Sequence, residues 1–441
     1  MDSERLAEQV AQRLAGHSKL LVAFSGGLDS SVLLHLLVQL RRQRPELQVR
    51  TVHVHHGLSR FADQWVAHCR QQCLEWQVQL QVQHVKVDSQ HGGIEAAARN
   101  ARYVALAEAL AGSETLLTAQ HLDDQCETFL LALKRGSGPA GLSAMAAQSQ
   151  LRGKPLLRPL LDFSRVQLEA YARQHSLRWI EDDSNQDARF DRNFLRLQVL
   201  PLLQQRWPHF AAASARSASL CAEQEQLLDE LLAEDLHALL ANDGSLAIAG
   251  LVACSPVRRF ALLRRWIARF GVTMPAREQL QRLWEEVAMA RPDAVPQLQL
   301  GQYQIRRYRQ HLYLLPQMAD LHALCLPWQP RLPLPDGLGT LVSGEGDILL
   351  RAPQPGELVS VRFSAEGKHR IIGRAHSRPI KKLWQELGVP PWLRERTPLI
   401  YYDAQLIAAL GVFVTEAGSV PPDEQPWRLR WDKEEENTKE Q

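Results

Sequence analysis

The chain has 441 residues, of which 45% are hydrophobic and 23% are charged. This length indicates two or three domains, and the composition excludes global disorder, collagen and coiled-coil rods. The net charge is only +2, but residues 256–310 hold eleven arginines against four acidic residues, and residues 351–396 hold ten basic residues against four. Solvated helix faces would explain either segment alone, whereas the two together favour surfaces for a polyanion.

The cysteines and the apolar segments restrict the class of protein further. Six cysteines are scattered along the chain without a Cys-x-x-Cys motif, so we expect reduced thiols and neither a disulfide framework nor a zinc finger. No apolar run approaches the ~20 residues that a membrane-spanning helix needs. The run Leu20–Phe24 is also too short for a signal peptide, and we therefore expect a cytoplasmic protein with no membrane partner.

Strands alternate with helices over the first 134 residues. Short apolar runs predict four strands, at residues 19–24, 49–55, 80–87 and 115–119, and 3.6-residue periodicity predicts four helices, at residues 30–44, 61–76, 94–110 and 124–134. This alternation predicts an α/β fold with a doubly wound parallel sheet. Ligands of such sheets bind beyond the carboxyl ends of the strands, so the residues that follow each strand are the candidates for function.

The pattern changes after residue 160. We expect helices at residues 164–176 and 193–205, a long connecting helix at 211–240, Arg-rich helices at 256–270 and 276–289, and strands within 303–315. Further on we expect strands at 357–363, 399–402 and 406–414 around a helix at 379–387. The predicted domains are an N-terminal α/β domain (1–209), a mainly helical domain that includes the connecting helix (210–320), a linker rich in Pro and Gly (321–350), a small α+β domain (351–430) and a charged tail (431–441).

The hexapeptide Ser25-Gly26-Gly27-Leu28-Asp29-Ser30 follows the first strand and opens a helix. Two adjacent glycines allow a tight turn, and their free amides together with the helix N-terminus form a nest for phosphate oxygens. Asp29 fits such a nest if it helps to hold Mg²⁺ or orients a reacting group. The loop is neither a Walker A motif nor a dinucleotide fingerprint. A simple strand-to-helix turn is the alternative.

Acidic residues follow the fourth strand. Asp124 and Glu127 have the spacing of a capping box, which would make them structural. The pair Asp123 and Asp124, at a strand end that faces Asp29, favours a metal or proton-handling role. His121 alone would be interpreted as a buried, hydrogen-bonded histidine.

Two other segments are also open to two interpretations. Glu95, Arg99 and Arg102 have helical spacing and could form a surface ladder of ion pairs. The glycines between Gly136 and Gly141 could end a helix or form a mobile lid.

The hexapeptide is the signature of the PP-loop ATP pyrophosphatases, and further motifs narrow the resemblance. These motifs are His53-Val-His-His-Gly57, Glu95-Ala-Ala-Ala-Arg99, Thr118–Thr128, Gly136–Leu142, Asp183-Ser-Asn185 and Arg192-Asn193-Phe-Leu-Arg196. In this order, over about the first 210 residues, the chain resembles the tRNA(Ile)-lysidine synthetases, and its later domains resemble their three-domain form. The resemblance implies an adenine nucleotide α-hydrolase-like fold.

The resemblance also implies a reaction. ATP and Mg²⁺ would serve to adenylate the wobble cytidine of a tRNA(Ile) with a CAU anticodon, and free L-lysine would then displace AMP to give lysidine. The implied roles are catalysis by Asp29, Asp124 and Glu95, with Asp29 at Mg²⁺, and ATP binding by residues 25–30 and His53, the latter through backbone contacts to adenine. Other residues expected at the cleft are Arg99, His121, Asp123, Glu127, Arg192, Asn193 and Arg196.

The basic downstream domains would bind the tRNA through phosphate contacts, and we expect Arg264, Arg265, Lys381 and Lys382 to contribute. The oligomeric state stays open, with a homodimer as one option. A PP-loop tRNA thiolation enzyme is the alternative function, which the absence of paired cysteines disfavours. A nucleotide-sensing RNA-binding protein without catalysis is the third option, against which the acidic residues after the strands argue.

Overall fold

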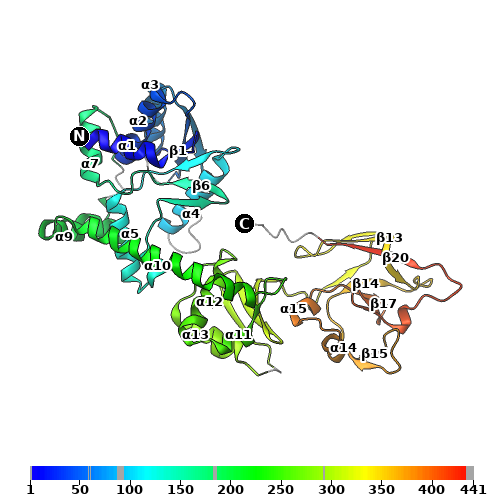
Figure 1. Ribbon diagram of the computed structural model, residues 1–441. Helices are drawn as coiled ribbons and strands as arrows, with labels where there is room; N and C mark the ends of the chain where they lie inside the picture. Colours follow the sequence, from blue (N-terminus) through cyan, green and yellow to red (C-terminus); the bar gives the residue numbers. More distant parts are fainter. Residues whose placement is uncertain are drawn as a thin grey trace. The chain divides into compact units, whose positions relative to one another are not determined.

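The chain forms two units, Met1–Leu231 and Leu232–Gln441. The computed structural model shown in Figure 1 describes residues 2–57, 59, 61–86, 94–181, 186–291 and 294–433. Among these residues, no helix combines the length and the hydrophobicity that crossing a lipid bilayer requires.

A six-stranded sheet organises the N-terminal unit, with the spatial order β3-β2-β1-β4-β6-β5. Its strands are β1 (Lys19–Ala23), β2 (Gln48–His55), β3 (Gln79–His84), β4 (Thr115–Leu117), β5 (Gln148–Leu151) and β6 (Lys154–Leu157). All neighbours pair in parallel except β5, which is antiparallel to β6. The doubly wound parallel sheet predicted from the sequence is therefore confirmed.

Helices cover both faces of this sheet. They are α1 (Asp2–Arg13), α2 (Leu28–Gln43), α3 (Ala62–Glu75), α4 (Ile94–Ala109), α5 (Leu122–Lys134), α6 (Pro139–Leu142) and α7 (Arg165–Gln174). On β1, Leu20 and Val22 belong to the core formed with α1, α2, α3 and α7, while Leu21 points to the opposite core, formed with α4. Burial on both faces explains why β1 is a continuous apolar run.

The hairpin of β5 and β6 is not among the strands predicted from the sequence. Both strands have four residues, and β5 alternates between exposed and half-buried positions. The connecting residues Arg152 and Gly153 both have positive φ angles, 49° and 75°, as a two-residue hairpin turn of type I′ requires. A strand this short has no clear apolar signal in the sequence.

A helical segment leads out of the N-terminal unit. It consists of α8 (Asp191–Phe194), the π-helical turn η2 (Leu195–Val199), α9 (Leu200–Arg206) and α10 (Phe210–Leu239). The last of these is the connecting helix predicted from the sequence, and it crosses the boundary between the two units.

The C-terminal unit begins with a core of helices on a small sheet. Its elements are β7 (Leu246–Ala247), α11 (Ile248–Ala253), α12 (Pro256–Ala268), α13 (Arg277–Arg282), the π-helical turn η3 (Leu283–Ala288), β8 (Gln297–Leu300), β9 (Tyr303–Tyr308) and β10 (His311–Pro316). Trp266 of α12 is fully buried at the centre, and its indole N–H donates to the Gly244 carbonyl at 2.9 Å.

The rest of the C-terminal unit is mainly β-sheet. A five-stranded sheet has the order β11-β14-β17-β18-β19, and a three-stranded sheet has the order β12-β13-β20. The elements are β11 (Cys325–Pro327), β12 (Arg331–Pro333), β13 (Thr340–Leu350), β14 (Val359–Arg362), β15 (Lys368–His369), β16 (Arg378–Pro379), α14 (Ile380–Glu386), α15 (Pro391–Arg394), β17 (Leu399–Tyr402), β18 (Gln405–Ala409), β19 (Phe413–Val414), the 3₁₀ turn η4 (Glu416–Gly418) and β20 (Trp427–Asp432).

Two expectations for this region need correction. Residues 321–350 were expected as a linker with short strands at most, but they include the eleven-residue strand β13, and Leu332, Leu341 and Leu350 are buried in the core. The charged tail was expected to begin at residue 431, but β20 continues to Asp432 and pairs with β13. Only Leu429 of β20 is fully buried, because this strand lies at the edge of its sheet and exposes its charged side chains.

Candidate active site

The loop after β1 combines tight backbone packing with hydrogen bonds among its own serine and glycine residues. Gly26 has a φ of +81°, and a Cβ atom at this position would lie 2.8 Å from the Cys69 sulfur, so only glycine fits here. The Ser25 hydroxyl contacts the Ser30 hydroxyl at 3.0 Å, and the Gly27 N–H donates to Ser25 at 3.3 Å. The side chain of Leu28 is buried in the core, and its backbone N–H lies in the first turn of α2, where a helix offers no internal acceptor.

A second segment fixes this loop from the other side. The Ile180 N–H donates to the Gly26 carbonyl at 2.9 Å. The motif residues Asp183 and Asn185 follow shortly after Ile180, but they lie outside the described residues. The loop is therefore held in a defined shape at the N-terminus of α2, a position where a helix favours an anion.

Asp29 lies in the first turn of α2 and is largely enclosed. Its Oδ2 atom is 3.6 Å from His121 Nε2 and 3.5 Å from an Arg165 guanidinium nitrogen. Burial alone would raise the pKa of Asp29, but His121 and the two arginines Arg165 and Arg196 outweigh burial and lower it. The carboxylate is thus held in its charged form. No pattern in the sequence pointed to Arg165, which comes from the start of α7.

His121 is the centre of a cluster of three carboxylates. Its side chain is 2% exposed, and its ring nitrogens lie 3.4 Å from Asp124, 3.6 Å from Asp123 and 3.6 Å from Asp29. Burial would lower the pKa of His121, but the interactions with Asp29, Asp124 and Asp123 raise it to about 9. The imidazole is therefore a cation near neutral pH, and it joins the loop after β1 to the start of α5.

Arginines from α8 and η2 close the other side of the cluster. Arg196 donates to Glu127 at 2.7 and 3.0 Å and to Asp124 at 3.1 Å. Arg192 lies 3.6 Å from Glu127 and 3.9 Å from Asp124. Glu127 is fully buried, and burial raises its pKa although the two arginines act in the opposite direction. Arg196 lies within the π-helical turn, a feature found at functional sites.

Asp124 does take part in a capping box at the start of α5, but its partner is His121 and not Glu127 as the spacing suggested. The helix α5 starts at Leu122, and the Asp124 carboxylate accepts the backbone N–H of His121 at 3.0 Å. Glu127 instead faces Arg196. Asp123 accepts the backbone N–H of Arg165 at 2.8 Å and a donor from Gln204 at 3.1 Å.

The remaining candidates lie around this cluster or outside it. The imidazole of His53 is buried and bonds the Phe24 carbonyl at 2.9 Å, and burial lowers its pKa. Asn193 donates to the Asp187 carbonyl at 3.0 Å. Arg99 is exposed, with its guanidinium 5.3 Å from the centre of the Tyr103 ring. Glu95 falls in the first turn of α4, and its side chain lies outside the described part of the chain.

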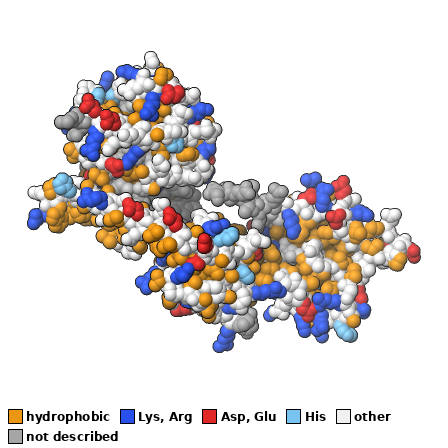
Figure 2. Space-filling view, viewed as in Figure 1, with side chains coloured by type: hydrophobic (Ala, Val, Ile, Leu, Met, Phe, Trp, Pro, Cys, Tyr) orange, Lys and Arg blue, Asp and Glu red, His pale blue; other side chains and the backbone are white. Residues whose placement is uncertain are grey.

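The downstream basic residues have different environments. Arg264 and Arg265 are half-buried and donate to the backbone carbonyls of Pro275 and Ala261, each at 3.3 Å. Lys381 and Lys382 lie exposed on α14. Figure 2 shows basic and acidic side chains next to one another on the visible face of the C-terminal unit. Ion pairs of this unit include the exposed pair Arg282–Glu286 and the less exposed pair Arg374–Glu386.

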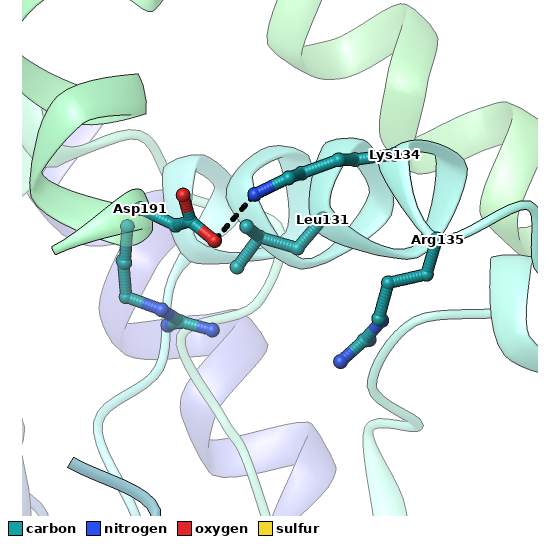
Figure 3. Close-up of a pocket in the computed structure, with 5 residues that line it drawn as sticks. Leu131, Lys134, Arg135 and Asp191 are labelled. Carbon is teal, nitrogen blue, oxygen red and sulfur yellow. Dashed lines mark hydrogen bonds and ion pairs between the residues drawn. The ribbon is translucent and has the colours of Figure 1, made fainter. Parts of the chain in front are cut away.

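A small pocket of about 230 Å³ lies at the C-terminal end of α5. Leu131, Lys134, Arg135, Asp191 and Arg192 line it. Figure 3 shows the Lys134 ammonium group and the Asp191 carboxylate pointing towards each other, at a distance of 2.6 Å. No motif or spacing in the sequence indicates this pocket.

The described residues contain no group of three or more His, Cys, Asp or Glu side chains that could hold a metal ion alone. One oxygen of Asp29, Oδ1, is buried and has no hydrogen-bond partner among these residues. Mg²⁺ is usually held by one or two carboxylates together with substrate phosphates and water. Asp29 beside a phosphate nest fits this mode of binding.

Three family models match the chain in order. A PP-loop domain matches residues 2–203, a TilS substrate binding domain matches residues 246–313, and a TilS substrate C-terminal domain matches residues 359–431. The tRNA(Ile)-lysidine synthase of Serratia proteamaculans (strain 568) is 76% identical over 98% of this chain and 100% of its own length. The chain belongs to the tRNA(Ile)-lysidine synthase family.

Other relatives are similar to this chain over nearly its full length. The tRNA(Ile)-lysidine synthase of Edwardsiella ictaluri (strain 93-146) is 62% identical over 98% of this chain and 100% of its own, and that of Shigella flexneri is 57% identical over 92% and 95%. Family membership confirms the resemblance found in the sequence. A solved U34-tRNA thiolase from Methanococcus maripaludis shares 15% identity over 50% of this chain and 80% of its own, with a TM-score of 0.43.

Proposed function

We propose that the chain is an ATP-dependent ligase that joins free L-lysine to the wobble cytidine of tRNA(Ile) with a CAU anticodon, forming lysidine, AMP and pyrophosphate. The identity of 76% over the full length of a tRNA(Ile)-lysidine synthase carries this proposal. The arrangement of charges supports it, because a phosphate nest and a cluster of carboxylates meet at His121.

The first step needs stabilisation of negative charge. The cytidine O2 atom attacks the α-phosphate of ATP, the bond to the β-phosphate breaks, and pyrophosphate leaves. The N-terminus of α2 and the loop that precedes it would bind the phosphates, for which the Gly27 N–H and the Ser30 hydroxyl would exchange their present partners Ser25 and Gly27 for phosphate oxygens. Asp29 would hold Mg²⁺, which supplies charge neutralisation when bound. His121 keeps Asp29 oriented.

The second step needs a proton acceptor. The lysine ε-amine attacks C2 of the adenylated cytidine, AMP departs, and the amine loses a proton. Asp124 is one candidate for this role, and its contacts with His121 and Arg196 keep it at the centre of the cluster. Glu95 is the second candidate base. The acidic groups around His121 also suit the cationic lysine substrate, since unlike charges attract in a partly enclosed site.

The C-terminal unit would hold the body of the tRNA. We assign the N-terminal α/β domain to catalysis and residues 246–313 and 359–431 to substrate binding, in line with the family models that match there. A single-stranded anticodon base can be splayed into the catalytic site at small cost.

Incorporation of label into RNA tests the proposal. The full chain is incubated with ATP, radiolabelled lysine and tRNA(Ile) with a CAU anticodon, and a tRNA with a changed wobble base serves as the control. We expect ATP-dependent transfer of label to the first tRNA alone. Hydrolysis of ATP without transfer of lysine to RNA would contradict the proposal.

The environment of Cys126 argues against sulfur transfer. Cys126 is fully buried in a small core with Leu200 and Ala211, and burial raises the pKa of its thiol. A sulfur carrier needs an accessible thiolate. The variant Cys126→Ser, if it folds, should therefore retain lysine transfer.

A further inference from the structure

We infer that the pocket at the end of α5 binds a phosphodiester of the anticodon loop next to the target cytidine. The inference rests on the proposed function and adds a binding site to it. Three of the five residues that line the pocket are cationic: Lys134, Arg135 and Arg192. A phosphodiester carries one negative charge and needs a few positively charged donors in a shallow, accessible site, which this pocket provides.

The position of the pocket along α5 links it to the reaction site. Asp124, Glu127, Leu131 and Lys134 follow one another on one face of the helix, because they are spaced by three or four residues. Lys134 therefore lies about 15 Å along the helix from Asp124. Asp29, in the first turn of α2, contacts His121 at the N-terminal end of α5, whereas the pocket lies at the C-terminal end of that helix. The pocket is thus separate from the nest that would bind ATP.

Arg192 connects the two sites directly. Its guanidinium group lines the pocket and also lies 3.6 Å from the buried carboxylate of Glu127. It also donates to the Thr128 hydroxyl at 3.2 Å. A phosphate in the pocket would therefore be separated from the carboxylates of the reaction site by the Arg192 side chain alone. A nucleotide next to the target cytidine in the same strand could span this separation.

The exposure and the weak pairing of Lys134 and Arg135 would allow an anion to bind and dissociate. Lys134 and Asp191 form a solvent-exposed ion pair, and 62% and 63% of their side chains are exposed. Arg135 is exposed as well and forms no ion pair within the part of the chain that the structure describes. Exposed ion pairs contribute little to stability, so an RNA phosphate can take the place of Asp191 at low cost. Figure 3 shows Leu131 next to the Lys134–Asp191 pair, and the Arg135 side chain extends away from this pair.

A purely structural role is the competing explanation. Lys134 and Arg135 lie at the C-terminus of α5, where cations stabilise the helix dipole, and the pair with Asp191 could serve only to position α8. The two explanations differ in the effect of removing Asp191. If the pocket binds a phosphate, removal of the Asp191 carboxylate frees Lys134 and strengthens tRNA binding. If the ion pair only positions α8, removal of Asp191 displaces Arg192 and weakens tRNA binding.

The test compares the full-length variants Arg135→Gln and Asp191→Asn with a control, Arg173→Gln. Arg173 is an exposed arginine of α7 that pairs with Glu169. We expect Arg135→Gln to raise the Kd for tRNA about three- to tenfold at low salt and to lower the slope of log affinity against log salt by about 0.7 to 0.9. Asp191→Asn should tighten tRNA binding. Thermal unfolding of all variants checks that they fold.

Three results would overturn the inference. The first is a tRNA affinity and salt slope of Arg135→Gln equal to those of Arg173→Gln. The second is weaker tRNA binding by Asp191→Asn. The third is a change in inhibition by pyrophosphate with no change in tRNA affinity, which would assign the pocket to the product. Failure of the proposed function would show separately, because the unsubstituted chain would then transfer no lysine.

Discussion

A single imidazole at the candidate active site contacts three carboxylates. Asp29, Asp123 and Asp124 each lie within 3.6 Å of His121. The protonated ring is one of the causes that lower the pKa of Asp29. We therefore regard His121 as a positioning residue that sets the charge of the site.

His121→Gln should make the stability of the protein less dependent on pH. The folded pKa of His121 is raised to about 9, above the ordinary value of about 6.5. The stabilisation by the protonated ring is therefore complete below about pH 6.5 and disappears as the pH rises through about 9. The difference in unfolding midpoint between the unsubstituted chain and His121→Gln should shrink over this range.

His17 offers a matched control for that experiment. It is a partly buried histidine that bonds the Thr115 hydroxyl at 2.8 Å and not a carboxylate. His17→Gln therefore reports the effect of losing a partly buried histidine that has no carboxylate partner, and the pH dependence of His121→Gln should exceed that of His17→Gln between pH 6.5 and 9. A difference for His121→Gln that depends on pH no more than that for His17→Gln would show that the ring is neutral in the folded protein.

Asp29→Asn should abolish lysine transfer and leave the fold intact. The substitution keeps the shape of the side chain but removes the charge beside the phosphate nest. Removal of one such electrostatic group costs about 10²–10³ in kcat. Asp162→Asn, which removes an exposed carboxylate paired with Arg13, should retain activity. Near-normal turnover by Asp29→Asn would rule out a role in holding Mg²⁺.

At the scale of elements, the packing of α7 on α2 depends on a buried neutral histidine. His35 of α2 bonds the Tyr171 hydroxyl of α7 at 2.9 Å, and its ring centre lies 5.0 Å from that of His175. Burial and the positive charges of His175 and Arg42 lower the pKa of His35 to about 4. Protonation of His35 therefore opposes the folded state.

The stability of the N-terminal unit should consequently fall in acid. A group with a lowered folded pKa stabilises the protein above its unfolded pKa, here about 6.5, and this stabilisation disappears as the pH falls through about 4. The decrease from this one group should be on the order of 2 kcal/mol. His35→Phe should lower stability at pH 7 but show a smaller decrease between pH 6.5 and 4, as followed by thermal unfolding. An equal decrease would contradict the assignment.

Elements with a strong local signal could be predicted from the sequence, and contacts between distant residues could not. The strand β1 and its loop were predictable because an apolar run ends in two glycines. The contact of Glu127 with Arg196 joins residues 69 positions apart, and a helical spacing alone suggested a capping box instead. Arg165 reaches Asp29 from a helix start whose sequence is ordinary. The strand β20 was missed because only Leu429 faces the core.

At the scale of the whole molecule, the two basic segments differ in how much charge they leave for a ligand. In the first segment, Arg264 and Arg265 are half-buried and bond backbone carbonyls, so reversing their charge would mainly destabilise the helix core. Lys381 and Lys382 are exposed, and neither forms an ion pair within the described residues. The second segment therefore offers the better test of tRNA binding.

The double variant Lys381→Glu/Lys382→Glu should weaken tRNA binding and leave ATP binding unchanged. Binding of a phosphate by a cationic side chain releases counterions, so removal of each such interaction should lower the salt slope by about 0.7 to 0.9, and removal of the pair by up to about twice that amount. Because the phosphate nest lies in the other unit, the KM for ATP should stay constant. Arg430→Glu is the control, since Arg430 already pairs with Glu345 and Asp432 on the same unit. If the double variant and the control give the same tRNA affinity and salt slope, α14 does not contact the tRNA, and binding must depend on other surfaces of the chain.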